Sequence, residues 1–173
     1  MHRFYVSSRV DLLDQNIVAS PFLYEDDAHE VDIEFSRWRK TRGNNAQFVV
    51  QPHAHAGNIH RYEMRLNGAE STHCFDWRPD AIHFQSLQGH VKEADSASAV
   101  IQDWTYTGKD NPAEREGVRI HINLWLIQGQ PPTDGKEAEF VLKDADLPGT
   151  YAAPAASQAK DRSEDASQSG ETR

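Results

Sequence analysis

The sequence predicts an all-β protein, a β-sandwich or barrel of short strands. Short segments rich in β-branched and aromatic residues follow one another along the chain, and segments rich in Gly, Pro, Asn and Asp separate them. No long window keeps apolar residues at the i, i+3, i+4, i+7 spacing of an amphipathic helix. Many short strands at close spacing are typical of a sandwich or barrel.

Each expected strand is bounded by turn material such as TRGNN, NGAES or GKDNP. The strands are expected at residues 4–10, 16–24, 29–35, 46–52, 60–66, 72–77, 81–87, 99–106, 118–127 and 137–144. The strand at 118–127 alternates most clearly between two faces. One face carries Ile120, Ile122, Leu124 and Leu126, and the other carries His121, Asn123 and Trp125. The second face therefore has residues suited to a function.

The composition divides the chain into one domain, residues 1–147, and a tail, residues 148–173. The chain of 173 residues is long enough for one domain with a real core. After about Pro148 the sequence is mainly Ala, Ser and charged residues. Such a segment buries too little apolar surface to offset its ordering entropy, so we expect a disordered tail.

The charge balance excludes several partners. There are 27 acidic and 18 basic residues, a net charge of −9, so neither nucleic acid nor an anionic membrane surface is an expected partner. The single cysteine, Cys74, excludes an intrachain disulfide and a cysteine zinc site. No apolar run reaches membrane-spanning length, and no signal peptide is visible. We expect a monomer.

The segment HEVDIEF, residues 29–35, carries the main chemical signal. On a strand, Glu30, Asp32 and Glu34 point to one side, opposite Val31, Ile33 and Phe35. Two glutamates that lean toward each other can bring their carboxyl groups to roughly 5–6 Å, the separation found in retaining glycosidases. Close like charges also raise a carboxyl pKa, as a general acid requires. A solvated strand face or a calcium site would explain the same pattern.

The wider context resembles glycoside hydrolase family 16, whose active-site strand reads E-[IL]-D-[IV]-E-F. THCFDWRPDAIHF is similar to a later stretch of that family, VRIHINLWL to its strand ending in N-L-W, and EAEFVLKD to its closing strand. The resemblance covers residues 3–144. It implies a concanavalin A-like jelly-roll β-sandwich of two antiparallel sheets, with the carboxylates on the concave face of a sugar cleft. By the same resemblance, strands and a secretion signal that precede this region in the family are lacking here, and an extracellular location is expected if the N-terminus is truncated.

The resemblance also implies roles for the site residues. Glu30 matches the nucleophile, Glu34 the general acid/base and Asp32 the assisting carboxylate of a double-displacement mechanism on a β-linked, β-glucan-like polysaccharide. His73 matches a histidine facing the cleft. No cofactor is implied, and a structural calcium has no assignable ligands.

Further substrate contacts follow from aromatic chemistry, because indole faces stack on the apolar faces of sugar rings. Of the four tryptophans, Trp38 and Trp125 are expected in the cleft, together with Asn123, and core packing is expected for at least two of the four.

Three alternatives remain open. HAH at 53–55 could chelate a metal, as in a cupin, but Glu63 follows too late for the cupin pattern and a loop is expected there. A non-catalytic lectin could use the same sandwich, although a lectin has no need of all three carboxylates. The carboxylates could also persist in a relative too short to be active.

Overall fold

The computed structural model describes residues 1–112 and 117–148. Within these residues the regular elements are ten strands and three short 3-10 helices, and no helix is long and apolar enough to cross a bilayer. The predicted tail lies outside the described residues from position 149 onward. The strands are β1 (His2–Val6), β2 (Ile17–Tyr24), β3 (Glu30–Phe35), β4 (Ala46–Val50), β5 (Ile59–Tyr62), β6 (Ser71–Trp77), β7 (Ile82–Gln88), β8 (Val100–Tyr106), β9 (Arg119–Leu126) and β10 (Leu142–Asp146). Short 3-10 helices are η1 (Val10–Leu12), η2 (Ala97–Ala99) and η3 (Ile127–Gly129).

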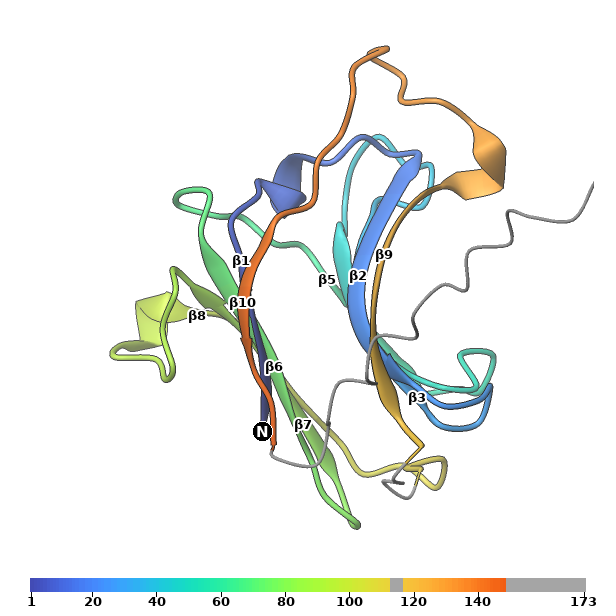
Figure 1. The fold of residues 1–173 in the computed structure, drawn as a ribbon, viewed down its shortest axis with the longest axis vertical. Helices are drawn as coiled ribbons and strands as arrows, with labels where there is room; N and C mark the ends of the chain where they lie inside the picture. The colour runs from blue at the N-terminus through green and yellow to red at the C-terminus, as the bar shows by residue number, and fades with distance from the viewer. Residues whose placement is uncertain (113–116, 149–173) are drawn as a thin grey trace, which may run out of the picture.

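The strands form two five-stranded sheets that pack against each other, which confirms the predicted β-sandwich (Figure 1). One sheet has the order β10-β1-β6-β7-β8 and the other has the order β5-β4-β3-β2-β9. Every strand pairing within the described residues is antiparallel. Because β3 lies at the centre of the second sheet, each of its outward side chains has neighbours on both β4 and β2.

The core between the sheets combines aromatic rings with aliphatic side chains. Phe48 of β4 stacks on Phe84 of β7, with ring centroids 4.9 Å apart. The hydroxyl of buried Tyr62 on β5 lies 2.7 Å from Ser86 Oγ on β7. Side chains alternate along a strand, so burial of the apolar face of β3 fixes its three carboxylates on the outer face.

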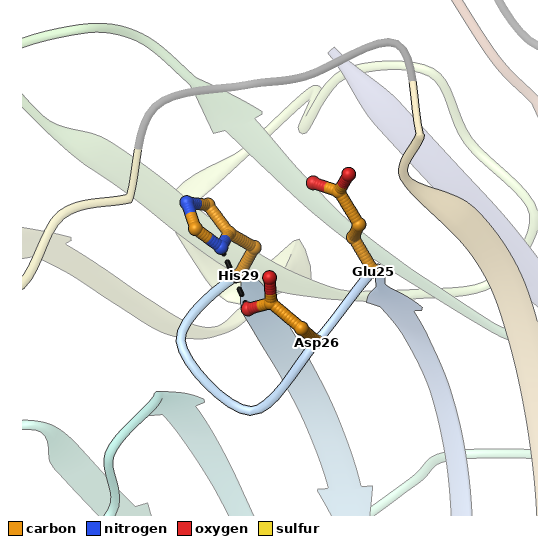
Figure 2. Close-up of side chains that lie close together, drawn as sticks. All are labelled: Glu25, Asp26 and His29. Carbon is orange, nitrogen blue, oxygen red and sulfur yellow. Dashed lines mark hydrogen bonds and ion pairs between the residues drawn. The ribbon is translucent and has the colours of Figure 1, made fainter.

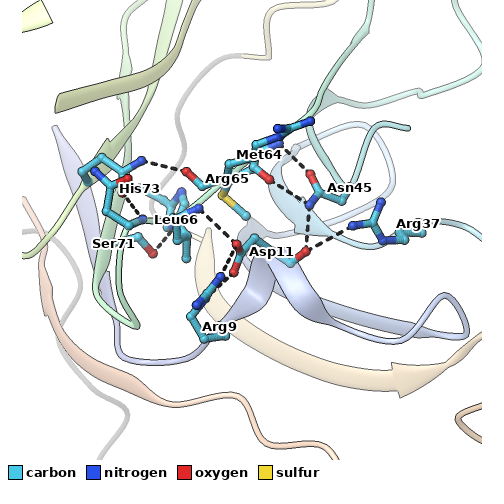
Figure 3. Close-up of polar contacts among 11 residues, drawn as sticks. Arg9, Asp11, Arg37, Asn45, Met64, Arg65, Leu66, Ser71 and His73 are labelled. Atoms are coloured by element: carbon cyan, nitrogen blue, oxygen red, sulfur yellow. Dashed lines mark hydrogen bonds and ion pairs between the residues drawn. The ribbon is translucent and has the colours of Figure 1, made fainter. Parts of the chain in front are cut away.

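A buried polar network holds the chain ends of several strands together around Asp11 (Figure 3). The Asp11 carboxylate, only 5% exposed, accepts two hydrogen bonds of 2.8 Å from Arg9 and one of 3.1 Å from the Leu66 N–H. Its carbonyl oxygen accepts hydrogen bonds from Asn45 Nδ2 and from Arg37. Burial favours a higher pKa, but these donors outweigh it and lower the pKa of Asp11. The network fixes the turn after β1 against the segments beside β4 and β5.

Three strands differ from the prediction by four residues or more at one end. β1 ends at Val6 rather than at residue 10, where the 3-10 helix η1 begins. β5 ends at Tyr62 rather than at residue 66, because the Met64 N–H donates to Asn45 Oδ1 at 2.7 Å instead of to a neighbouring strand. β10 begins at Leu142 rather than at residue 137, since pairing with β1 starts opposite Val6. For β5 and β10 a tertiary contact overrides the local alternation.

Candidate active site

The three carboxylates of β3 lie in a row on the outer face of the sheet β5-β4-β3-β2-β9. We call this surface the carboxylate face and define it by Glu30, Asp32 and Glu34. On the opposite side of β3, the apolar residues between them have no exposed surface and belong to the core. Asp32 is only 4% exposed even though it points outward, whereas Glu30 and Glu34 are half-buried. The row therefore has a covered centre and two accessible ends.

Burial raises the pKa of each carboxyl in the row, and the charges of neighbouring carboxylates add to this effect for Glu30 and Asp32. For Asp32, burial and the charges of Glu30 and Glu34 raise the pKa well above its usual range. Asp32 and Glu30 also share a hydrogen bond, which lowers the pKa of Glu30 and raises that of Asp32, although burial leaves the pKa of Glu30 raised on balance. Protonated Asp32 can thus donate to ionised Glu30. Burial likewise raises the pKa of Glu34.

Two glutamines hold Glu34, at one end of the carboxylate row, and Asp32, at its centre, in place. Gln47 Nε2 donates a short hydrogen bond to Glu34 Oε2, and Gln51 Nε2 donates to Asp32 Oδ2 at 3.2 Å. Gln51 Oε1 in turn accepts the His53 N–H at 2.8 Å. The charge of His53 lowers the pKa of both Glu30 and Glu34, in each case against the larger effect of burial. These residues orient the carboxyl groups from the β4 side.

Aromatic side chains continue the carboxylate face on the β2 side. In the β2–β3 register, Phe22 is opposite Asp32 and Tyr24 is opposite Glu30, and directly opposed residues share a face. Phe22 is also opposite His121 of β9, whose ring lies 5.1 Å from that of Phe22 and 5.5 Å from that of Tyr24. The carboxylates therefore adjoin a platform of rings.

The structure places Asn123 and Trp125 on this same face, further along β9. Both alternate with His121 in phase, and they lie opposite Ser20 and Val18 of β2. Trp125 is 46% exposed, so its indole is available to a ligand. β9 is separated from β3 by β2 alone, which brings these residues to the side of the carboxylate row.

Trp38 reaches the other side of the row through an arginine. The Arg61 guanidinium carbon lies 5.1 Å from the centroid of the Trp38 ring, and Arg61 Nε donates to Gln47 Oε1 at 2.8 Å. Gln47 joins this pair to Glu34, and the charge of Arg61 lowers the pKa of Glu34 against the larger effect of burial. Trp38 is therefore linked to the site through Arg61 and Gln47.

His73 does not face the carboxylates, contrary to the expectation. It is fully buried between the sheets, 4.6 Å from the ring of Phe35, which belongs to the core side of β3. Its ring nitrogens lie 2.7 Å from Ser86 Oγ and 2.9 Å from Ser71 Oγ. Burial lowers the pKa of His73 to about 3, so it is a neutral structural residue. The alternation of β6 places His73 on the same side as buried Phe75 and Trp77, a local pattern that the prediction set aside in favour of the family resemblance.

The remaining tryptophans are structural, as expected for two of the four. Trp77 is 7% exposed and donates from Nε1 to the Pro112 carbonyl at 2.8 Å. Trp104 packs against the core with its ring 5.2 Å from both Phe84 and His60. Neither indole belongs to the carboxylate face.

One group of metal-ligating side chains occurs among the described residues, in the turn between β2 and β3 (Figure 2). Ligand atoms of Glu25, Asp26 and His29 lie within 4.8 Å of one another. Asp26 Oδ1 is already bonded to His29 Nδ1 at 2.7 Å and to the Ala28 N–H at 2.9 Å. These bonds explain the turn without an ion, so we assign no metal here.

The HAH segment lies in the loop between β4 and β5, as predicted, and its two imidazoles have different partners. His53 Nδ1 lies 3.3 Å from Gln51 Oε1, whereas His55 Nδ1 lies 2.9 Å from Asp110 Oδ2. The structure gives no support to a shared metal at this pair.

Comparison with family models, with curated proteins and with solved structures finds no significant match. The site therefore has to be interpreted from its own geometry. Sequence reasoning missed Gln47, Gln51 and Arg61, which contact the carboxylates or each other. A polar residue inside the apolar run AQFVV was the available signal for Gln47.

Proposed function

We propose that this chain is a glycoside hydrolase that cleaves O-glycosidic bonds of a β-linked, β-glucan-like polysaccharide with retention of configuration. The observation that carries the proposal is the carboxylate row, in which burial raises the pKa of Glu34 while a hydrogen bond shared with Asp32 opposes the effect of burial on Glu30. Glycosidases need one ionised and one protonated carboxyl flanking the scissile bond. The resemblance of HEVDIEF to the family 16 strand assigns the same roles to the same residues.

The proposed reaction has two displacement steps. Glu30 attacks the anomeric carbon while Glu34 transfers its proton to the departing glycosidic oxygen, which leaves a covalent glycosyl ester on Glu30. Glu34, now ionised, removes a proton from water, and the resulting attack on the anomeric carbon releases the sugar and restores Glu30. Asp32 donates its hydrogen bond to the Glu30 carboxylate in the free enzyme. This bond positions Glu30 and limits its protonation.

Reducing-sugar release from a panel of β-glucans and galactans tests the proposal. We expect release by the parent and a loss of at least about 1000-fold in Glu30→Gln and Glu34→Gln, because each removes a group that acts on the reacting atoms. Glu63→Gln is the matched control, since Glu63 is an exposed carboxylate paired with Arg65. Undiminished release by Glu30→Gln would remove Glu30 from its role.

Azide rescue of the alanine variants distinguishes the nucleophile from the general acid/base. In Glu30→Ala the small anion can attack the sugar directly, which gives a glycosyl azide of inverted configuration. In Glu34→Ala it intercepts the ester on Glu30 and gives an azide of retained configuration. The opposite assignment of the products would exchange the two roles.

The exposed rings of the carboxylate face also favour the lectin alternative, because they can bind a glycan without catalysis. Calorimetric titration of the parent and of Glu30→Gln with β-glucan oligosaccharides distinguishes the two functions. Binding by both without any release of sugar by the folded parent would favour a lectin.

A further inference from the structure

β9 leaves a large apolar surface uncovered at the edge of its sheet. Within the described residues β9 pairs with β2 alone, so one row of its backbone groups has no strand partner. Its inward face, expected to be half-buried, is open: Ile122 is 50% exposed, Leu124 44% and Leu126 39%. Beside Leu124 and Leu126 the surface forms a recess of about 510 Å³. Figure 1 shows β9 along the open margin of the sandwich.

This edge lacks the features that usually prevent an edge strand from pairing with another chain. Edge strands are usually short, bulged, or protected by Pro, Lys or inward-pointing charges. β9 is eight residues long and pairs with β2 without a register shift. Residues 120–126 include no Asp, Glu, Lys, Arg or Pro. A strand of this kind is a template for the addition of another strand.

We propose that β9 pairs antiparallel with β9 of a second copy of this chain, in place of the monomer expected from the sequence. A two-fold axis perpendicular to the sheet preserves the faces, so residues of equal parity must oppose each other. When the axis passes through Asn123, the uncharged residues 120–126 of one copy pair with the same residues of the other copy. Ile122 then opposes Leu124 of the partner, and Ile120 opposes Leu126 of the partner, on the inward face.

Charge makes β9 a region where two copies can approach each other. The chain has a net charge of −9, so two copies repel each other over most of their surfaces. The stretch 120–126 is a neutral region, and its only titratable residue is His121. Two such strands meet without like-charge repulsion, while the three exposed aliphatic side chains on each leave water.

The pairing extends the carboxylate face, a consequence that rests on the proposed function. On the outer side, His121 opposes Trp125 of the partner, so each copy adds an indole to the ring platform of the other. The two carboxylate rows face the same way on a ten-stranded sheet. Five interstrand spacings of ~4.8 Å separate them, about 24 Å in all. One polysaccharide chain can then contact both sites.

Sedimentation equilibrium and a cysteine cross-link test the dimer. We expect the parent to sediment as a dimer, and Leu124→Lys to weaken dimerisation at least about 100-fold, because the ammonium would be placed in the apolar contact. Thr105→Lys, on the exposed edge strand β8, is the matched control and should sediment as the parent does.

Asn123→Cys tests the register. Opposed Cα atoms of an antiparallel pair lie about 4.5–5.5 Å apart, within the range of a disulfide. Mild oxidation should therefore cross-link Asn123→Cys but not Thr105→Cys, and the buried Cys74 should not react. A monomeric parent, or Asn123→Cys that stays uncross-linked while Thr105→Cys reacts, would overturn the proposal. These measurements need no substrate, so failure of the proposed hydrolase activity would not affect them.

Discussion

At the scale of single residues, the pKa of each carboxyl on the carboxylate face depends on which side chains donate hydrogen bonds to it. Burial raises the pKa of Glu34, and the hydrogen bond from Gln47 is the largest of the effects that oppose it. Arg61, bonded to the same glutamine, acts in the same direction. The ionisation of the proposed general acid is thus set by a neighbouring strand.

Substitution of Gln47 should therefore change the titration of Glu34. In Gln47→Met the donor is lost and Arg61 is released, so the pKa of Glu34 should rise further above its ordinary value. Carboxyl carbon NMR measures this shift directly. If the hydrolase proposal holds, the alkaline limb of kcat/KM moves to higher pH, because that limb reports deprotonation of the acid.

Gln85→Met is the matched control for this experiment. Gln85 donates to Asp103 at 2.9 Å on the outer face of the other sheet. Its removal should leave the Glu34 titration unchanged. An unchanged Glu34 pKa in Gln47→Met would contradict the role given to that hydrogen bond.

Asp11 contributes to the free energy of unfolding and lies outside the proposed active site. Asp11→Asn replaces a buried carboxylate that accepts two bonds from Arg9, so we expect the free energy of unfolding to fall by about 2 kcal/mol at pH 7. The folded pKa of Asp11 lies below its ordinary value of 3.8, so the contribution is complete above that value and is lost as the pH falls through the folded pKa. Urea unfolding of both proteins from pH 7 to pH 3 measures the difference, which should narrow only at the acid end. A constant difference across the range would contradict the ionic origin.

At the scale of elements, alternation within a strand was predictable and pairing between strands was not. A period of two placed Glu30, Asp32 and Glu34 together on one side of β3, since that depends only on local backbone geometry. The contact between Gln47 and Glu34 depends on the β3–β4 register, which is set across a loop of ten residues, 36–45. The exposure of Leu124 depends on β9 being an edge, which no local pattern encodes. His73 was misplaced for a different reason: the prediction followed the family resemblance, although the alternation of β6 places His73 on the buried side with Phe75 and Trp77.

Two tryptophans on different elements should respond oppositely to removal. Trp125 is exposed on β9, so Trp125→Ala should leave the unfolding free energy almost unchanged and weaken oligosaccharide binding to Glu30→Gln about 3- to 10-fold. Trp77 is buried on β6, so Trp77→Ala should lower the unfolding free energy by about 3–5 kcal/mol. Calorimetric titration and denaturant unfolding check the pair. Equal binding by Trp125→Ala and its parent would remove Trp125 from the platform.

At the scale of the whole molecule, every strand of the described structure lies between His2 and Asp146. The fold class followed from strand and turn composition because five of the eight strand pairings, β2–β3, β3–β4, β4–β5, β6–β7 and β7–β8, join strands that are consecutive in sequence. The last strand completes the first sheet: β10 pairs with β1, and Tyr5 on β1 donates to Asp146 at 2.7 Å. The predicted boundary at residue 147 thus falls just after the last paired residue.

Truncation at that boundary should leave the fold intact. A chain ending at Leu147 keeps all the strand pairings of the described structure, so its melting temperature should stay within about 2 °C of the full chain. A chain ending at Phe140 loses β10 and leaves β1 unpaired on one side, which should lower the melting temperature by well over 5 °C or prevent folding. Circular dichroism melts of the three proteins make the comparison. A large drop for the chain ending at Leu147 would mean that residues 148–173 contribute to the stability of the sandwich, against the composition argument for a tail.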